Sequence, residues 1–317
     1  MTSVTVVAIS VFDANMLLLK TNMNTPQQLH IPVLLDDVLA TLAPRAGESY
    51  LDLTAGYGGH AGAIIAKTQA PERAVLVDRD DNAISGLRNQ CGFTNSSLMH
   101  LDFLAAAEKF VDAGKHFDMI LLDLGVSSPQ LDRAERGFSF SNDAQLDMRM
   151  DTGQTRTAAE IVNYSSEKDL TDIIVRYGEE SVKRARKIAH AIRLNRPINT
   201  TGELARIIKK VSPPGGKIHP ATRTFQAIRI AVNDELGQLE RTLPLLPGLL
   251  NPGGRLAIIS FHSLEDRIVK NFLNEHAQAG YEADLCLATK KPIVAGATEL
   301  VYNPRARSAK LRGAVKT

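Results

Sequence analysis

The residues best suited to chemistry begin with a glycine-rich turn after a short apolar run. The run covers residues 50–53, and Gly56, Gly58 and Gly59 follow it directly. Glycine adopts backbone conformations that are closed to other residues, and it lets a ligand lie against the main chain. The stretch after the turn, residues 61–67, predicts a helix whose free N–H groups would point at such a ligand. Because ordinary turns have the same composition, the motif indicates a binding site only together with other residues.

Acidic residues stand at or near the ends of the neighbouring apolar runs. Asp78 ends one run, and Asp123 closes another just before a glycine. A carboxylate about 20 residues after the glycines is suited to bind the ribose hydroxyls of NAD or of S-adenosylmethionine. Asp52 inside the first run, and the Gly59-His60 pair after the turn, favour the methyl donor. Each of these aspartates could instead cap a helix or form a turn.

The elements that must position these residues are strands alternating with helices. Apolar runs occur at residues 50–53, 73–78, 97–100 and 117–124. Continuous apolar runs of this kind predict a parallel sheet that is covered on both faces. Ligands of such sheets bind at the carboxyl ends of the strands. Asp78, Phe103 and Asp123 all lie at or just beyond such ends.

The alternation stops near residue 130 and resumes near residue 251. Helical patterns fill the interval, at residues 158–164, 167–177, 182–194, 204–211 and 221–236, and a further strand is predicted at 255–261. We therefore predict an α/β domain, formed by residues 30–130 and 237–317, that is interrupted by a helical insertion, residues 131–236.

Positive charge is concentrated in the predicted insertion. Residues 181–233 contain twelve Lys or Arg and a single acid, Glu203, although the net charge of the whole chain is only +2. Because solvated faces normally mix both signs, this imbalance favours a polyanionic partner. The candidates for phosphate contacts are Lys183, Arg184, Arg186, Lys187, Arg223 and Arg229. We expect the neighbouring Phe225 to be a core residue. The chain after Glu299 also has an excess of positive charge, with five basic residues and no acid.

Cysteine usage and hydropathy narrow the class of protein further. Cys91 and Cys286 are far apart, which excludes a disulfide framework and a cysteine-rich zinc site. The apolar run 4–12 is a poor signal peptide, and no later run is long enough to span a bilayer. We therefore predict a cytoplasmic protein. Residues 1–29 show no clear period, and we interpret them as a disordered or non-native extension, with Met23 as an alternative start.

Long matching stretches show that the chain resembles the bacterial MraW family of small-subunit ribosomal RNA methyltransferases. The resemblance covers nearly everything from His30 to Arg312, in stretches at residues 30–35, 58–60, 121–131, 135–140, 146–151, 219–227, 259–268 and 303–312. It implies a Rossmann-like class I S-adenosylmethionine-dependent methyltransferase sheet with an all-helical insertion. It also implies N4-methylation of a cytidine in the decoding region of 16S rRNA.

The resemblance also implies roles for individual residues. Cofactor contacts carried over by position fall on Gly58, Gly59, His60, Asp78, Phe103, Asp123 and Gln130. No metal is expected, because the sulfonium is already activated and positioning supplies most of the rate. The Asp-Pro-Pro-Tyr motif of many amino-methyltransferases is absent. In its place we expect Asp123 to accept a hydrogen bond from the target amine, with Ser260 and His262 near the base.

Two other classes of protein remain open at this point. A small-molecule methyltransferase or an NAD enzyme would explain the glycine turn but not the basic insertion. A non-catalytic RNA-binding or assembly factor would explain the insertion alone. Under the favoured interpretation the partner is small-subunit rRNA or the assembling small ribosomal subunit, no membrane is involved, and a homodimer is left open.

Overall fold

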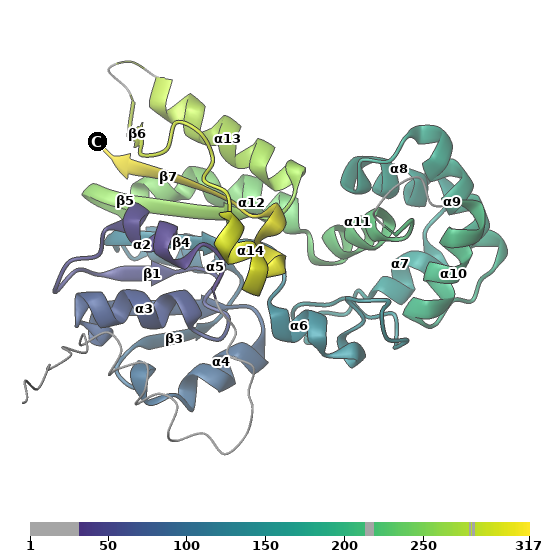
Figure 1. The fold of residues 1–317 in the computed structure, drawn as a ribbon, viewed down its shortest axis with the longest axis horizontal. Coiled ribbons are helices and arrows are strands. Elements are labelled where there is room, and N and C mark those ends of the chain that lie inside the picture. Colours follow the sequence, from purple (N-terminus) through teal and green to yellow (C-terminus); the bar gives the residue numbers. More distant parts are fainter. Residues whose placement is uncertain (1–31, 213–218, 279, 281–282) are drawn as a thin grey trace, which may run out of the picture. The chain divides into compact units, whose positions relative to one another are not determined.

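A seven-stranded sheet organises the chain (Figure 1). The computed structural model describes residues 32–212, 219–278, 280 and 283–317, so the predicted N-terminal extension lies outside the described residues. The strands are β1 (Tyr50–Asp52), β2 (Ala74–Asp78), β3 (Ser97–His100), β4 (Phe117–Asp123), β5 (Leu250–Ser260), β6 (Leu285–Leu287) and β7 (Lys310–Lys316). Their order is β3-β2-β1-β4-β5-β7-β6. Strands β1 to β5 run parallel, and β7 is antiparallel to both of its neighbours. This arrangement confirms the predicted class I methyltransferase sheet.

The central strands are apolar on both sides because helices cover both faces of the sheet. The side chains of 119–122 in β4 are all fully buried. Successive side chains of a strand point to opposite faces. Accordingly, Met119 and Leu121 belong to one buried cluster, whereas Ile120 and Leu122 belong to another. For this reason residues 119–122 of β4 form a continuous run of apolar residues and do not alternate between apolar and polar ones.

Each face of the sheet has its own helices. One cluster is completed by α2 (Leu35–Leu42), α3 (Gly59–Thr68) and α4 (Asp81–Arg88). The other is completed by α5 (Phe103–Asp112), α12 (Glu235–Thr242), the 3-10 segment η4 (Leu243–Leu249) and α13 (Ser263–Gln278). The remaining short elements of the sheet region are η1 (Pro71–Arg73), η2 (Cys91–Phe93), α14 (Ala297–Tyr302) and η6 (Pro304–Ser308). None of the helices in the described part of the chain has the length and apolar character needed to cross a bilayer.

Helices fill the chain between β4 and β5. They are α6 (Ser128–Asp132), η3 (Ala134–Arg136), α7 (Ala158–Tyr164), α8 (Glu167–Gly178), α9 (Val182–Leu194), α10 (Thr201–Val211) and α11 (Thr222–Asn233). A third buried cluster has all its members within residues 138–232, and Phe225 is among them, as expected. In the described part of this region, strand pairing is limited to one bridge, between Gln145 and Thr200.

The helices differ from the prediction most clearly at two places. Helix α10 begins at Thr201, earlier than expected, because Thr200 and Glu203 form a capping box. The single helix predicted at 221–236 is broken at Asp234, which adopts a left-handed conformation with φ 49°. The break separates α11, which packs in the cluster of the helical region, from α12, which packs on the sheet.

Candidate active site

The glycine turn after β1 leaves the start of α3 open. Gly58 is the N-cap of α3 and has φ 83°, so a side chain there would be strained. A Cβ at Gly58 would also lie 2.5 Å from the Phe93 ring. No side chain caps this helix. The first N–H groups of α3 therefore remain available to a carboxylate or phosphate.

Asp78 holds the turn in place from the end of β2. Its two carboxylate oxygens accept from the Gly56 and Asp80 amides, each at 2.7 Å. Burial raises the pKa of Asp78 to about 6, although these amide hydrogen bonds act in the opposite direction. Each carboxylate oxygen keeps a further lone pair, so Asp78 can still accept from ribose hydroxyls as predicted.

Asp52 supports the same turn from inside β1. It accepts from the Tyr50 hydroxyl at 2.7 Å and from the Thr54 amide at 3.1 Å. Burial raises its pKa to about 7. The Thr54 hydroxyl in turn accepts from the Asp123 amide at 2.6 Å. Both Asp52 oxygens thus bind the protein itself, and the side chain is fully buried, so Asp52 is placed to hold the turn and not to contact a ligand.

Asp123, at the end of β4, presents an acceptor without a partner. Its Oδ2 lies 3.6 Å from His60 Nδ1. Its Oδ1 is buried and has no hydrogen bond among the described residues. Burial and the charges of Asp52 and Glu265 raise the pKa of Asp123 well above its usual value. A buried, unpaired carboxylate oxygen fits a ligand that brings a donor or a positive charge.

The other two predicted cofactor residues lie at the same edge but differ in their contacts. Phe103 is the first residue of α5, just beyond β3, and packs against the core from a partly buried position. Gln130 is buried, and both ends of its amide are engaged. It accepts from the Ser127 amide and donates to Asp80 Oδ2, each at 2.9 Å. Gln130 therefore braces α6 against Asp80.

The two residues predicted to lie near the base, at the end of β5 and just after it, differ in their surroundings. Ser260 is 2% exposed, and its hydroxyl lies 3.4 Å from the Lys310 carbonyl of β7. In the sheet, β7 is on the side of β5 away from β4. The expectation that Ser260 lies near the base therefore finds no support in these contacts. His262 follows at the start of α13 and packs against Glu265.

The predicted phosphate contacts divide into three residues without an ion pair among the described residues and three that pair with glutamates. Lys183, Arg186 and Lys187 are exposed on α9 and have no ion pair within the described residues. The other three pair with glutamates: Arg184 and Arg223 lie 3.6 Å and 3.9 Å from Glu180, and Arg229 binds Glu235 through two hydrogen bonds of 2.9 Å and 2.8 Å.

Arg229 is the clearest departure from the prediction. Its side chain is only 17% exposed, and Glu235 occupies its guanidinium in a bidentate pair. Such a pair satisfies the charge inside the protein and leaves little of it for a phosphate. Arg229 is therefore better explained as a structural residue, and we leave it out of the RNA-binding surface.

Comparison with known proteins identifies the family. A model described as the MraW methylase family matches residues 27–317. The chain belongs to this family. It is 46% identical over 301 residues to "Ribosomal RNA small subunit methyltransferase H" of Acidobacterium capsulatum, covering 92% of this chain and 99% of that one. The protein of the same name from Synechocystis sp. is 47% identical over 293 residues, covering 90% and 93%.

Two solved structures that resemble this MraW-family chain do so distantly. A putative methyltransferase from Streptococcus mutans in complex with SAH has a TM-score of 0.43 and 10% identity, covering 91% of this chain and 100% of that one. TrmN from Thermus thermophilus has a TM-score of 0.42 and 12% identity, covering 90% and 48%. Likeness at this level has no bearing on function.

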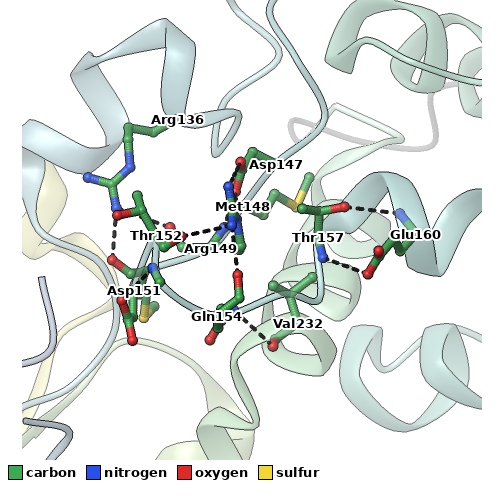
Figure 2. Close-up of polar contacts among 12 residues, drawn as sticks. Arg136, Asp147, Met148, Arg149, Asp151, Thr152, Gln154, Thr157, Glu160 and Val232 are labelled. Atoms are coloured by element: carbon green, nitrogen blue, oxygen red, sulfur yellow. Dashed lines mark hydrogen bonds and ion pairs between the residues drawn. The ribbon is translucent and has the colours of Figure 1, made fainter.

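One connection in this MraW-family site was not anticipated from the sequence. Arg136 NH1 donates to Asp80 Oδ2 at 2.9 Å, and NH2 donates to the carbonyls of Arg149 and Met150 at 3.0 Å and 2.8 Å. Figure 2 shows Arg136 beside the segment 147–157. Asp80 is thereby linked to this segment, and the Asp80 amide also donates to Asp78. The one signal in the sequence was that Arg136 lies in a stretch shared with the family.

Proposed function

We propose that the protein transfers a methyl group from S-adenosylmethionine to the exocyclic N4 of a cytidine in the decoding region of small-subunit rRNA. Membership of the MraW methylase family and the printed names of the relatives support methylation of small-subunit rRNA. The observation that carries the rest is Asp123 Oδ1, a buried acceptor without a partner among the described residues, at the end of β4.

The residues at the sheet edge fit the cofactor. The uncapped start of α3 would hold the carboxylate of its methionine part, and Asp78 would accept from its ribose. Phe103 would pack against the adenine, since an aromatic ring offers a flat apolar surface. When bound, S-adenosylmethionine supplies a methyl group that its sulfonium has already activated.

The task left to the protein is to prepare the amine. The lone pair of cytosine N4 is delocalised into the ring, so the amine is a poor nucleophile. Asp123 Oδ1 would accept a hydrogen bond from N4–H, orient the amine and take up the proton that it loses. The raised pKa of Asp123 makes it a better proton acceptor than an ordinary carboxylate. No metal is needed for this role.

RNA would be held by the exposed basic face of α9. Lys183, Arg186 and Lys187 project from one helix whose buried side packs in the core of the helical region. A base must leave its stack to reach a cofactor at a sheet edge, so a single-stranded or splayed target is expected. The substrate is thus either the rRNA itself or the assembling small subunit.

The decisive experiment is a methyl-transfer assay on small ribosomal subunits and on their rRNA, both from cells that lack the gene. We expect labelled methyl to appear as N4-methylcytidine at one position, and Asp123→Asn to reduce the rate at least tenfold at saturating cofactor. Calorimetric titration should show binding of S-adenosylmethionine and none of NAD. Label on another atom, on a small molecule or on no RNA at all would refute the proposal.

A further inference from the structure

We propose that His262 determines the base specificity of the site by donating a hydrogen bond from Nε2–H to ring N3 of the target cytosine. This inference rests on the proposed function, because it concerns how the same site recognises the base. In this role His262 donates a hydrogen bond to the substrate and does not accept a proton from it. Three features of the site support this role: the tautomer of the His262 imidazole, the lack of a hydrogen bond to Nε2 among the described residues, and the position of Asp123 on the neighbouring strand.

The contacts of His262 at the start of α13 select its tautomer. Its Nδ1 accepts from the Glu265 amide at 3.3 Å, and Glu265 Oε2 accepts from the His262 amide at the same distance. This is the reciprocal pattern of a capping box, with the imidazole in the place of a hydroxyl. A neutral imidazole has one acceptor nitrogen and one donor nitrogen. Because Nδ1 accepts, the proton is on Nε2.

The Nε2–H group is buried and lacks an aligned acceptor. The side chain of His262 is 9% exposed. Glu265 Oε1 lies 3.1 Å from Nε2, but the N–H does not point at it, and Nε2 has no hydrogen bond among the described residues. Leaving such a donor unsatisfied costs free energy, so a buried donor of this kind indicates a missing ligand.

A cation is a poor candidate for that ligand. One atom each of Glu235, His262 and Glu265 lie within 4.8 Å of one another, which is close enough to surround a metal ion. However, His262 has no lone pair left, since Nδ1 caps the helix and Nε2 carries the proton. Arg229 already donates to both oxygens of Glu235. These three residues therefore offer a ligand one hydrogen-bond donor, His262 Nε2–H, and do not offer the free lone pairs that a metal ion would need.

The neighbouring strand supplies the complementary acceptor. Strands β4 and β5 are adjacent and parallel, with Asp123 paired to Ile259, three residues before His262. In the part of the chain that the structure describes, Asp123 Oδ1 and His262 Nε2 are thus a buried unpaired acceptor and a buried unpaired donor at the ends of neighbouring strands. Glu265 contacts His262 directly, and its charge contributes to the raised pKa of Asp123.

This pair of groups matches cytosine and mismatches uracil. Cytosine presents an N4–H donor beside the N3 acceptor, and these would face Asp123 Oδ1 and His262 Nε2–H. Uracil presents an O4 acceptor beside an N3–H donor, so both contacts would become repulsive. Sites built around buried hydrogen bonds reject mismatched analogues strongly, because their polar groups are then left unpaired.

The test combines a change in the enzyme with a change in the base. His262→Asn keeps a side-chain oxygen that can cap α13, as asparagine commonly does, but it is too short to replace Nε2–H. On the RNA side, 3-deazacytidine at the target position replaces N3 by C–H and keeps N4. Reconstituted small subunits with either base serve as substrates, and kcat/KM is measured for all four combinations.

We expect each single change to reduce kcat/KM by about 10- to 100-fold, equivalent to about 1.4–2.7 kcal/mol, because a buried group is left without its hydrogen bond. The two changes together should cost little more than either alone, because they remove the same hydrogen bond. His262→Gln serves as a second variant, with an amide donor and a longer reach, and should recover part of the loss with cytidine but not with 3-deazacytidine. Melting temperature and affinity for S-adenosylmethionine should stay close to those of the wild type.

Independent effects would overturn the inference. If the losses multiply, or if His262→Asn leaves kcat/KM unchanged, His262 does not donate to N3. A drop in melting temperature with multiplicative losses would assign His262 to the cap alone. Failure of the wild-type enzyme to methylate the cytidine would instead refute the proposed function, so the two failures are distinguishable.

Discussion

Replacing Arg136 by methionine would test whether Asp80 depends on the segment that follows α6. The Arg136 and Asp80 side chains are 10% and 3% exposed, and their ion pair measures 2.9 Å. Methionine keeps most of the aliphatic volume and removes three hydrogen bonds, one to Asp80 and two to backbone carbonyls. It leaves a buried carboxylate without its counter-charge.

The expected decrease in stability is a large one. Removing one partner of a buried pair costs about 3–5 kcal/mol. Gln130 and Asn82 still donate to Asp80, so we expect a value at the lower end, about 3 kcal/mol. The Asp80 amide also donates to Asp78, and a shift of that carboxylate should weaken binding of S-adenosylmethionine by roughly tenfold, equivalent to about 1.4 kcal/mol.

Urea denaturation followed by circular dichroism gives the free energy of unfolding, and calorimetry gives the cofactor affinity. The matched control is Arg305→Met, which breaks an exposed ion pair with Asp132. The side chain of Arg305 is 43% exposed and that of Asp132 is 60% exposed. That change should cost no more than about 1 kcal/mol. A decrease for Arg136→Met as small as that of the control would refute the reasoning.

The pH dependence of the same variant has a definite sign. Burial acts to raise the pKa of Asp80, but the hydrogen bonds from Gln130 and Arg136 outweigh it and leave the pKa below its usual value. Stability from a lowered pKa is present above the unfolded value of about 3.9 and is lost as the pH falls through the folded pKa. The difference between wild type and variant should therefore be constant near neutrality and shrink below about pH 4.

Two further predictions concern the RNA surface and the buried acid of β1. Replacing Lys183, Arg186 and Lys187 together by alanine should weaken RNA binding and flatten its salt dependence by about 0.7 for each phosphate that the protein no longer neutralises; filter binding over a range of salt concentrations measures both, and an unchanged slope would place the RNA elsewhere. Asp52→Asn should remove a fall in stability with rising pH. The pKa of Asp52 is about 7 in the folded protein and about 3.9 in the unfolded chain. Between these pH values the unfolded chain loses the proton more readily, so the stability of the folded wild type falls as the pH rises. Melting temperatures from pH 4 to 8 should decline less in the variant, and parallel curves would contradict this.

The sheet was predictable because its sequence signals are local. Strand β3 and helices α7 and α9 have the predicted bounds, since an apolar run or a 3.6-residue period ends there at polar residues. The acids expected at the edge lie there because a parallel sheet puts all carboxyl ends of its parallel strands on one side. Strand β5 begins at Leu250, five residues before the predicted start at residue 255.

Charge was the least reliable guide, because a sequence does not show which charges are paired. Lys310 and Arg312 counted toward a basic C-terminal end, yet both lie in β7 and bind Asp266, at 2.9 Å and 2.8 Å. Arg229 is likewise paired internally. The residues that remain for the proposed RNA contacts are those on the exposed face of α9, such as Lys187, which have no ion pair among the described residues.

The two halves of the site differ in how they are assembled. The cofactor half is built from neighbouring strands early in the chain, where Asp78 and Asp52 bind the backbone of the glycine turn. The proposed base-binding half would join Asp123 and His262, which the whole helical region separates in sequence. That region leaves the sheet at the carboxyl end of β4, directly after Asp123, and Arg79 ties its last helix to the end of β2 through the Asn233 carbonyl at 3.3 Å. Under the proposed function, the helical region that would hold RNA thus begins next to Asp123 and is hydrogen-bonded to the residue after β2. A change that loosens these attachments should therefore raise KM for RNA without altering the chemistry at Asp123.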